Sequence, residues 1–165
     1  MIPLISENLK LALVEQLGME LENSNFYMRV SAFLKSKGLE NLGSYFYEQV
    51  KEEREHADIL YKMLTDLNQD FSIPSISGIE MNYGSFVEIA EEYLRREEST
   101  TSSLKEIMDM SAEDESSGCG VVKSVMLSML SMQQHELAES STMLDKANIL
   151  KEWWQVSLWD SSLGK

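Results

Sequence analysis

The sequence predicts an all-α protein: a four-helix bundle with a long crossover between its second and third helices and a short fifth helix at its carboxyl end. Leu, Met, Glu and Lys, which favour helices, are abundant. The chain has two prolines among 165 residues, and both lie outside the stretches of helical periodicity. Four such stretches are long enough to form bundle helices. A chain of this length closes one core, so we expect residues 1–165 to form a single domain.

The first two helices are predicted over residues 7–37 and 40–69. Ser6 precedes the first apolar period and can accept a hydrogen bond from the first helical turn, as an N-cap residue does. Gly38 follows the last residue of that period and can adopt the left-handed conformation that ends a helix. The second period then runs without interruption to about residue 69.

Residues 70–84 show no helical period and contain Pro, Gly and Ser, so they are predicted to form a loop. Fifteen extended residues reach about 50 Å, whereas a thirty-residue helix is about 45 Å long. The loop can therefore run the whole length of the bundle, and the third helix is predicted to lie parallel to the second.

The third helix is predicted over residues 85–111, because Ser85 and Glu88 have the spacing of a capping box. The fourth is predicted over residues 121–147, after a break of acidic residues, serine and glycine. The tail, 148–165, carries three tryptophans and is expected to form the short fifth helix. Large aromatic side chains seldom stay in water, so we expect all three to pack on the bundle or on another subunit.

The charge balance limits the possible partners. Twenty-eight acidic residues against fourteen basic ones give a formal charge of −14, which disfavours binding to nucleic acid or to an anionic membrane and favours cations. No run of about 18 apolar residues is present, so no membrane span is predicted. The single Cys119 forms no intrachain disulfide, and the first residues lack a secretory signal, so a cytoplasmic location is expected.

The residues that line the core of a helix bundle follow one another at intervals of three and four along each helix. The inward residues predicted for the first and second helices are Leu13, Leu17, Glu20, Ser24, Tyr27, Ser31, Leu34, and Leu42, Phe46, Gln49, Glu53, His56, Leu60, Met63, Leu67. Those predicted for the third and fourth are Phe86, Ala90, Tyr93, Glu97, Thr100, Leu104, Ile107, and Val122, Met126, Met129, Gln133, Glu136, Ser140, Met143, Ala147.

Every one of these inward stripes has a carboxylate near its middle, and no Lys or Arg shares the stripes. A buried unpaired carboxylate costs several kcal/mol, so four of them at one level require cations. Four negative charges match two divalent ions, and His56, three residues after Glu53, adds a nitrogen ligand that suits iron, zinc or copper better than calcium or magnesium. The sequence therefore predicts two metal ions bridged by carboxylate. The carboxylates are Glu20, Glu53, Glu97 and Glu136.

The spacing of these residues resembles that of the non-haem ferritins, most closely the bacterial ones. Tyr27 follows Glu20 by seven residues, and Glu53 and His56 form a Glu-x-x-His motif. The intervals from Glu20 to Glu53 and from His56 to Glu97, 33 and 41 residues, are those expected of a bacterial ferritin, as is the Gln-x-x-Glu of the fourth helix. The resemblance covers all four long helices.

This resemblance implies a ferritin-like fold and an iron-storage ferroxidase, which oxidises Fe(II) with O2 or H2O2 at a dinuclear iron centre. It implies a homo-oligomeric shell of 24 subunits that holds a ferric mineral. Tyr27 is expected either to fill space or to supply an electron, and Tyr93 is interpreted as core packing. The implied metal ligands are Glu20, Glu53, His56, Glu97 and Glu136, with Gln133 hydrogen-bonding beside them.

Three positions depart from patterns known among ferritins. Arg54 stands where the haem-binding bacterioferritins have a methionine, so no haem is expected. Glu52 matches one ligand of the third iron site of bacterial ferritins, but Met132 and His135 stand where that site has carboxylates.

The fourth helix allows a second register, in which Gln134 and Leu137 replace Gln133 and Glu136 on the inner face. That shift would turn Asp145 inward, so the first register is preferred. Two other functions fit the pattern. One is a rubrerythrin-like di-iron oxidase or peroxidase without storage, which the absence of a Cys-x-x-Cys module disfavours. The other is a catalytically silent helical shell or interaction protein.

Overall fold

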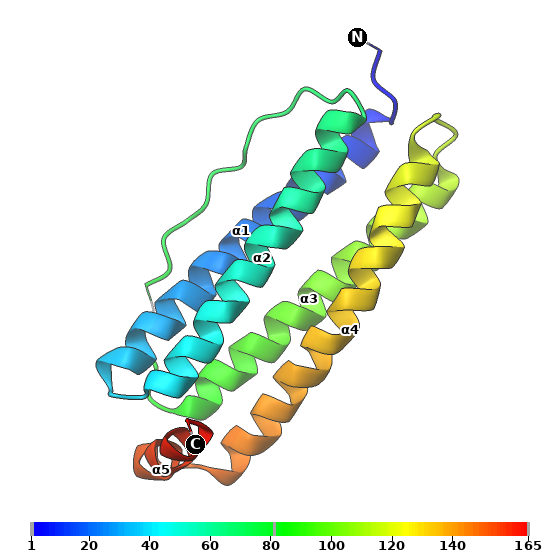
Figure 1. The fold of residues 1–165 in the computed structure, drawn as a ribbon. Helices are drawn as coiled ribbons and strands as arrows, with labels where there is room; N and C mark the ends of the chain where they lie inside the picture. The colour runs from blue at the N-terminus through cyan, green and yellow to red at the C-terminus, as the bar shows by residue number, and fades with distance from the viewer. Residues whose placement is uncertain (1, 81, 165) are drawn as a thin grey trace.

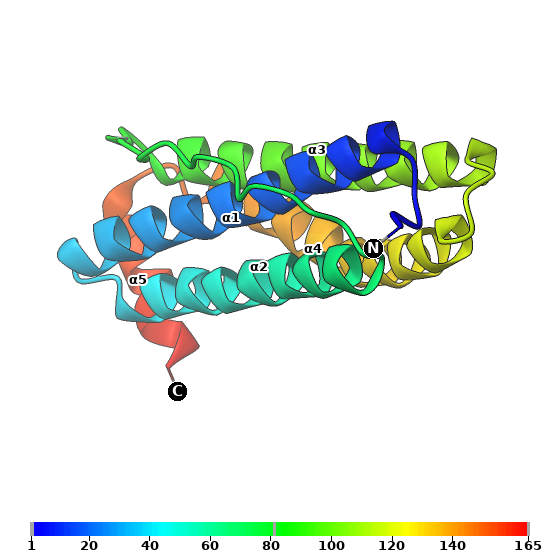
Figure 2. The same cartoon turned by 90° about the horizontal axis from the view of Figure 1, so that it is seen from above.

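The computed structural model describes residues 2–80 and 82–164 and contains helices but no strands within them. The helices are α1 (Glu7–Ser36), α2 (Glu40–Asp66), α3 (Phe86–Glu113), α4 (Cys119–Ile149) and α5 (Trp153–Leu163). Helices α1 and α2 form one antiparallel pair and α3 and α4 the other, and α5 lies across one end of the bundle (Figures 1 and 2). The predicted all-α architecture with its short fifth helix is confirmed.

The long connection between α2 and α3 runs beside the bundle from one end to the other, so α3 lies parallel to α2, as predicted (Figure 1). Pro74 of this connection packs against α1 at Gly18, where an added Cβ would lie 3.2 Å from the proline ring. Among the described residues, no helix is both long and apolar enough to cross a membrane.

The first two helices both end at a residue in the left-handed conformation. Gly38 has φ of +78°, and the N–H of Leu39 donates to the Leu34 carbonyl at 3.0 Å. Helix α2 ends at Asp66, three residues before the predicted position, because Asn68 adopts φ of +59° and the N–H of Gln69 turns back to the Leu64 carbonyl. Asparagine tolerates this left-handed conformation better than most residues do.

The predicted N-terminal cap of α3 is present, but one of its two hydrogen bonds differs from the prediction. The Ser85 hydroxyl accepts the Glu88 N–H at 3.3 Å, as predicted. The Glu88 carboxylate, however, accepts the N–H of Gly84 at 3.1 Å, one residue earlier than a standard capping box requires. Helix α3 extends two residues beyond its predicted end, and α4 begins two residues before its predicted start.

All the residues that the register predicts to face inward are buried. The apolar ones form two clusters: one at the α5 end, which includes Phe26 and Phe46, and one at the opposite end, which includes Leu13 and Leu104. The predicted carboxylates and His56 belong to neither cluster, and they form a polar layer between the two.

The three tryptophans do not share one environment. Trp153 donates its ring N–H to the Gly84 carbonyl at 3.0 Å, and Trp159 packs edge-on against Phe86 with ring centroids 6.0 Å apart. Trp154 is 64% exposed, so it does not pack on the bundle, and for this residue the other predicted environment, another subunit, stays a prediction. An eleven-residue helix lying on a surface buries one face, and Trp154 falls on the other.

Candidate metal centre

The polar layer at mid-bundle draws its side chains from all four long helices. Helix α1 supplies Glu20, α2 supplies Glu53 and His56, α3 supplies Glu97, and α4 supplies Glu136. These five residues are between 0% and 6% exposed. The four-helix arrangement therefore brings four carboxyl groups and one imidazole, which normally remain in water, together in the core.

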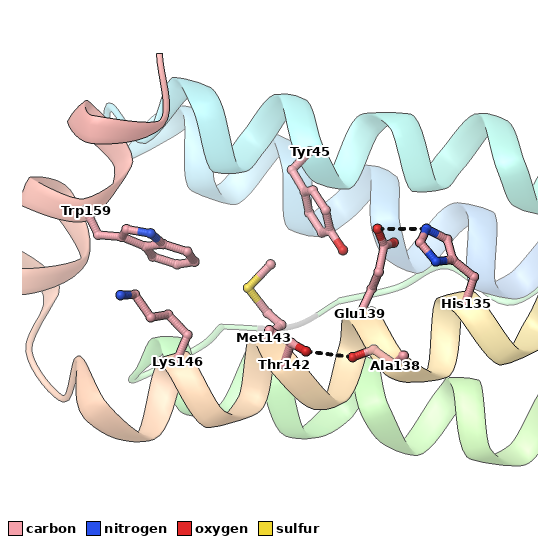
Figure 3. Close-up of a pocket in the computed structure, with 8 residues that line it drawn as sticks. All are labelled: Tyr45, His135, Ala138, Glu139, Thr142, Met143, Lys146 and Trp159. Atoms are coloured by element: carbon pink, nitrogen blue, oxygen red, sulfur yellow. Dashed lines mark hydrogen bonds and ion pairs between the residues drawn. The ribbon is translucent and has the colours of Figure 1, made fainter. Parts of the chain in front are cut away.

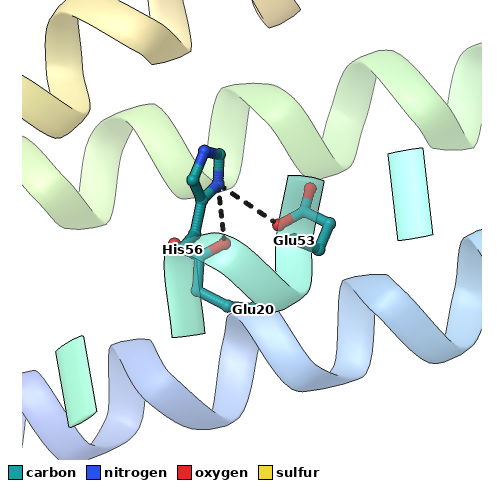
Figure 4. A group of neighbouring side chains, drawn as sticks. All are labelled: Glu20, Glu53 and His56. Carbon is teal, nitrogen blue, oxygen red and sulfur yellow. Dashed lines mark ion pairs between the residues drawn. The ribbon is translucent and has the colours of Figure 1, made fainter. Parts of the chain in front are cut away.

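The five side chains form two overlapping sets of possible metal ligands. Glu20, Glu53 and His56 make one set, and Glu53, Glu97 and Glu136 make the other; within each set the ligand atoms lie within 4.8 Å of one another. In the first set, His56 Nδ1 lies 3.7 Å from Oε2 of Glu20 and 3.7 Å from Oε2 of Glu53 (Figure 4). Glu53 belongs to both sets, so it stands where a bridging carboxylate would stand.

Several ligand atoms of this layer have no hydrogen-bond partner. A buried polar atom without a partner costs about 1–3 kcal/mol, and more when it is charged. A cation that accepts oxygen and imidazole ligands would satisfy all of them together, so the chemistry of the donor set fits a metal centre. The unpartnered atoms are Oε2 of Glu20, Oε2 of Glu53, Nδ1 of His56 and Oε2 of Glu136.

The electrostatics of the layer agree with this fit. Burial, reinforced by the neighbouring Glu20 carboxylate, holds the pKa of Glu53 well above its usual range. Burial also raises the pKa of Glu136 to about 8. Burial lowers the pKa of His56, but contact with Glu20 outweighs it and raises that pKa to about 9. Without a metal ion the layer therefore holds protons in place of cations, and metal binding releases protons.

Two residues of the predicted set orient Glu97. Gln133 donates from Nε2 to Glu97 Oε2 at 2.6 Å, and Tyr27 donates its hydroxyl to the other oxygen, Oε1. Both partners are buried. They fix the direction in which Glu97 presents its lone pairs, as partners behind a ligand do in metal sites.

Gln16 is a further hydrogen-bond partner in the layer and lies outside the residues predicted from the sequence. It is fully buried and donates from Nε2 to Glu20 Oε1 at 2.6 Å. It lies one turn before Glu20 on α1, next to the inward stripe. The i, i+4 spacing of an amide and a carboxylate on one helix was the available signal.

On α4, Gln133 and Glu136 are buried and Gln134 is exposed, in agreement with the preferred register. Outside the layer, His135 is exposed and lies 3.2 Å from Glu139 on the same helix, and Met132 is 37% exposed. The structure does not bring these two residues into either ligand set.

The comparisons with known proteins agree on one family. The model of the ferritin-like domain matches residues 10–150. A probable bacterial non-heme ferritin-like protein of Haemophilus influenzae is 29% identical over 153 residues, which are 90% of this chain and 88% of the relative. The bacterial non-heme ferritin of Staphylococcus aureus is 24% identical over 111 residues, 67% of each chain. An open pore ferritin from the archaeon Archaeoglobus fulgidus shares the fold, with a TM-score of 0.88 and 19% identity over 96% of both chains.

Proposed function

The chain belongs to the ferritin-like domain family, and from this premise we propose that it stores iron, oxidising Fe(II) at the polar layer of each subunit. One observation carries the proposal: two sets of metal ligands share Glu53 and leave four buried atoms without partners. A silent shell protein has no use for such a layer, because hydrophobic residues of similar volume would be more stable in its place.

In the proposed reaction Fe(II) is the substrate. One ion binds to Glu20, Glu53 and His56 and a second to Glu53, Glu97 and Glu136, while Glu53 bridges them. Two Fe(II) ions give one electron each to O2, which takes up two protons and leaves as hydrogen peroxide. With peroxide as the oxidant, the same two electrons and two protons yield two molecules of water.

The protein contributes positions and protons to this reaction. The raised pKa values of Glu53 and Glu136 mean that these groups release protons as iron arrives. Gln133 and Tyr27 hold Glu97 in one orientation, so that the second ion meets a prepared ligand. Fe(III) then leaves both sites and enters the stored ferric mineral.

For the assembly, we propose a homo-oligomeric shell of 24 subunits, as the resemblance to ferritins implies. The formal charge of −14 supports a role for the shell in concentrating cations and nucleating the ferric mineral. Sedimentation of the purified protein gives its subunit number directly.

Aerobic addition of Fe(II) to the purified protein tests the function. We expect the ferric absorbance to grow much faster than in buffer and many iron atoms per subunit to remain bound after gel filtration. Rapid oxidation without retention would indicate a rubrerythrin-like oxidase instead, and oxidation no faster than in buffer would refute the proposal. Anomalous scattering from crystals soaked in Fe(II) would place the ions relative to Glu53.

A further inference from the structure

Three tyrosine rings connect the polar layer with the surface. Tyr27, which donates its hydroxyl to Glu97, packs edge-on against Tyr93 with ring centroids 5.4 Å apart. Tyr93 in turn packs against Tyr45 at 6.4 Å, and their hydroxyl oxygens are 3.0 Å apart. Phe46 fills the space beside all three rings. The aromatic contacts are continuous from the metal ligand Glu97 to Tyr45.

The hydrogen bonds of this series have a definite direction. Tyr93 donates its hydroxyl to Oε1 of the buried Gln49 at 3.1 Å. A phenol has a single hydroxyl hydrogen, so in the contact between Tyr45 and Tyr93 it is Tyr45 that donates. Burial raises the pKa of both phenols, which therefore keep their hydrogens at neutral pH.

Tyr45 lines a groove of about 410 Å³ at the junction of α2, α4 and α5 (Figure 3). Its ring extends from α2 into this space, and Glu139 and Met143 of α4 lie on the opposite side. The partly exposed Tyr45 is thus the member of the series that opens on solvent, whereas Tyr27 and Tyr93 are fully buried.

Packing alone does not require these hydroxyl groups. Phenylalanine would fill the same volume without the desolvation cost of a buried hydroxyl, and Phe26 and Phe46 do so beside them. A phenol has one property that phenylalanine lacks: it gives up an electron and a proton at accessible potentials. Three phenols in contact, starting at a metal ligand and ending at a groove, are arranged for that chemistry.

We propose that Tyr27, Tyr93 and Tyr45 carry a one-electron oxidising equivalent from the metal centre to the groove when peroxide meets a subunit holding a single Fe(II). The inference rests on the proposed ferroxidase function. Reduction of hydrogen peroxide to two waters needs two electrons and two protons. Fe(II) supplies one electron, and the second passes from Tyr45 through Tyr93 and Tyr27.

Atoms and electrons balance in this step. The O–O bond of peroxide breaks, the Tyr45 hydroxyl releases its proton through the groove, and a second proton comes from solvent. The products are two waters, one Fe(III) and a neutral Tyr45 phenoxyl radical. Without the second electron, the same encounter would release a hydroxyl radical into the protein core.

Trapping of the radical tests the proposal. The whole protein is loaded without oxygen with one Fe(II) per subunit, and hydrogen peroxide is added with the spin trap 2-methyl-2-nitrosopropane. Peptide mass spectrometry then locates the adduct. We expect the adduct on Tyr45 in the original protein and at least a tenfold loss of it in Tyr93→Phe and Tyr27→Phe. The exposed Tyr47, also on α2 but outside the series, serves as the internal control for freely diffusing radicals.

A second measurement does not require the variants at buried positions to fold. Tyr45→Phe changes a partly exposed residue, and hydroxyl radical trapped in solution should rise several-fold in it but stay unchanged in Tyr47→Phe. Equal labelling of Tyr45 and Tyr47, or a Tyr45 adduct that persists in Tyr93→Phe, would overturn the relay. So would the absence of a Tyr45 adduct while iron is oxidised. Failure of the original protein to oxidise iron would instead refute the ferroxidase function.

Discussion

Glu53 is the residue on which the candidate centre depends most. Its carboxylate belongs to both ligand sets, is 2% exposed, and has an oxygen with no hydrogen-bond partner. A residue selected for stability alone would not be a carboxylate at this position, because burial and three neighbouring acids all oppose its charge. Function and stability are therefore opposed at this side chain.

This opposition gives a prediction for Glu53→Gln. The amide is neutral at every pH, whereas the buried Glu53 carboxyl must take up a proton when the metal-free protein folds, so the variant should be more stable than the original protein by about 1–3 kcal/mol in urea denaturation at neutral pH. Fast Fe(II) oxidation should fall by roughly 100-fold in stopped-flow measurements, since a ligand shared by both sites is lost. The exposed Glu55, two residues along α2, supplies the matched control Glu55→Gln, which should change neither quantity. A variant as active as the original protein would remove Glu53 from the site.

Asp114 gives a prediction of pH dependence away from the centre. Hydrogen bonds from Ser116 and Ser6 lower the pKa of this carboxyl to about 2, from an ordinary value of 3.8. Because the pKa is lowered in the folded protein, the ionised group stabilises the fold above pH 4, and this contribution disappears as the pH falls through 2. Asp114→Asn should therefore be less stable than the original protein at pH 6, and the difference should shrink towards zero near pH 2. Thermal melting of both proteins across this range measures it, and a constant difference would contradict the assignment.

At the scale of the helices, the sequence predicts best those helix ends that a single residue type marks. Gly38 and Ser6 are read directly from residue type, and both positions are confirmed. The sequence predicts the end of α2 three residues too late, because Asn68 is compatible with either a continuing helix or a left-handed residue that ends it. The choice between the two depends on packing at that end of the bundle, which a single sequence does not contain.

The candidate centre was predictable for a similar reason. Helical periodicity decides which side chains face inward, and a carboxylate on an inward stripe is visible as an exception to it. Gln16 lies beside the stripe, and its burial depends on how closely α1 approaches its neighbours. Tyr45 and Tyr93 come from different helices, so their hydroxyl contact could be found only from the three-dimensional structure.

The loop between α3 and α4 gives a prediction at the same scale. Gly118 lies against the segment before α1, and a Cβ added there would be 2.6 Å from the Leu4 carbonyl oxygen and 2.7 Å from the Leu67 side chain. Gly118→Ala should thus lower the free energy of unfolding by roughly 1–3 kcal/mol, because backbone atoms must move. Gly120→Ala is the control: a Cβ at Gly120 meets no atom within 4 Å, and alanine in the first turn of α4 should stabilise by up to about 1 kcal/mol. Equal effects in urea denaturation would contradict the packing argument.

The whole molecule consists of two apolar clusters separated by one polar layer. Each cluster can hold its end of the bundle together, but neither compensates the acids between them. The metal-free fold is therefore weakest at mid-height, and two cations, one in each ligand set, would together link all four long helices. Because one ligand set draws on α1 and α2 and the other on α2, α3 and α4, binding and stability are coupled through this one layer.

Binding of a redox-inactive ion should consequently stabilise the molecule without any oxidation. Zn(II) accepts imidazole and carboxylate ligands, and at about 100 times its dissociation constant it should add about 2.7 kcal/mol to the free energy of unfolding. For a chain of this size the melting temperature should rise by roughly 5–10 °C. Mg(II) should give a much smaller shift, because it prefers oxygen ligands in a strict octahedral geometry. In Glu53→Gln the Zn(II) shift should largely disappear. If Zn(II) stabilised that variant as much as the original protein, the ion would be acting at the acidic surface, and the coupling between this layer and the stability of the bundle would be refuted.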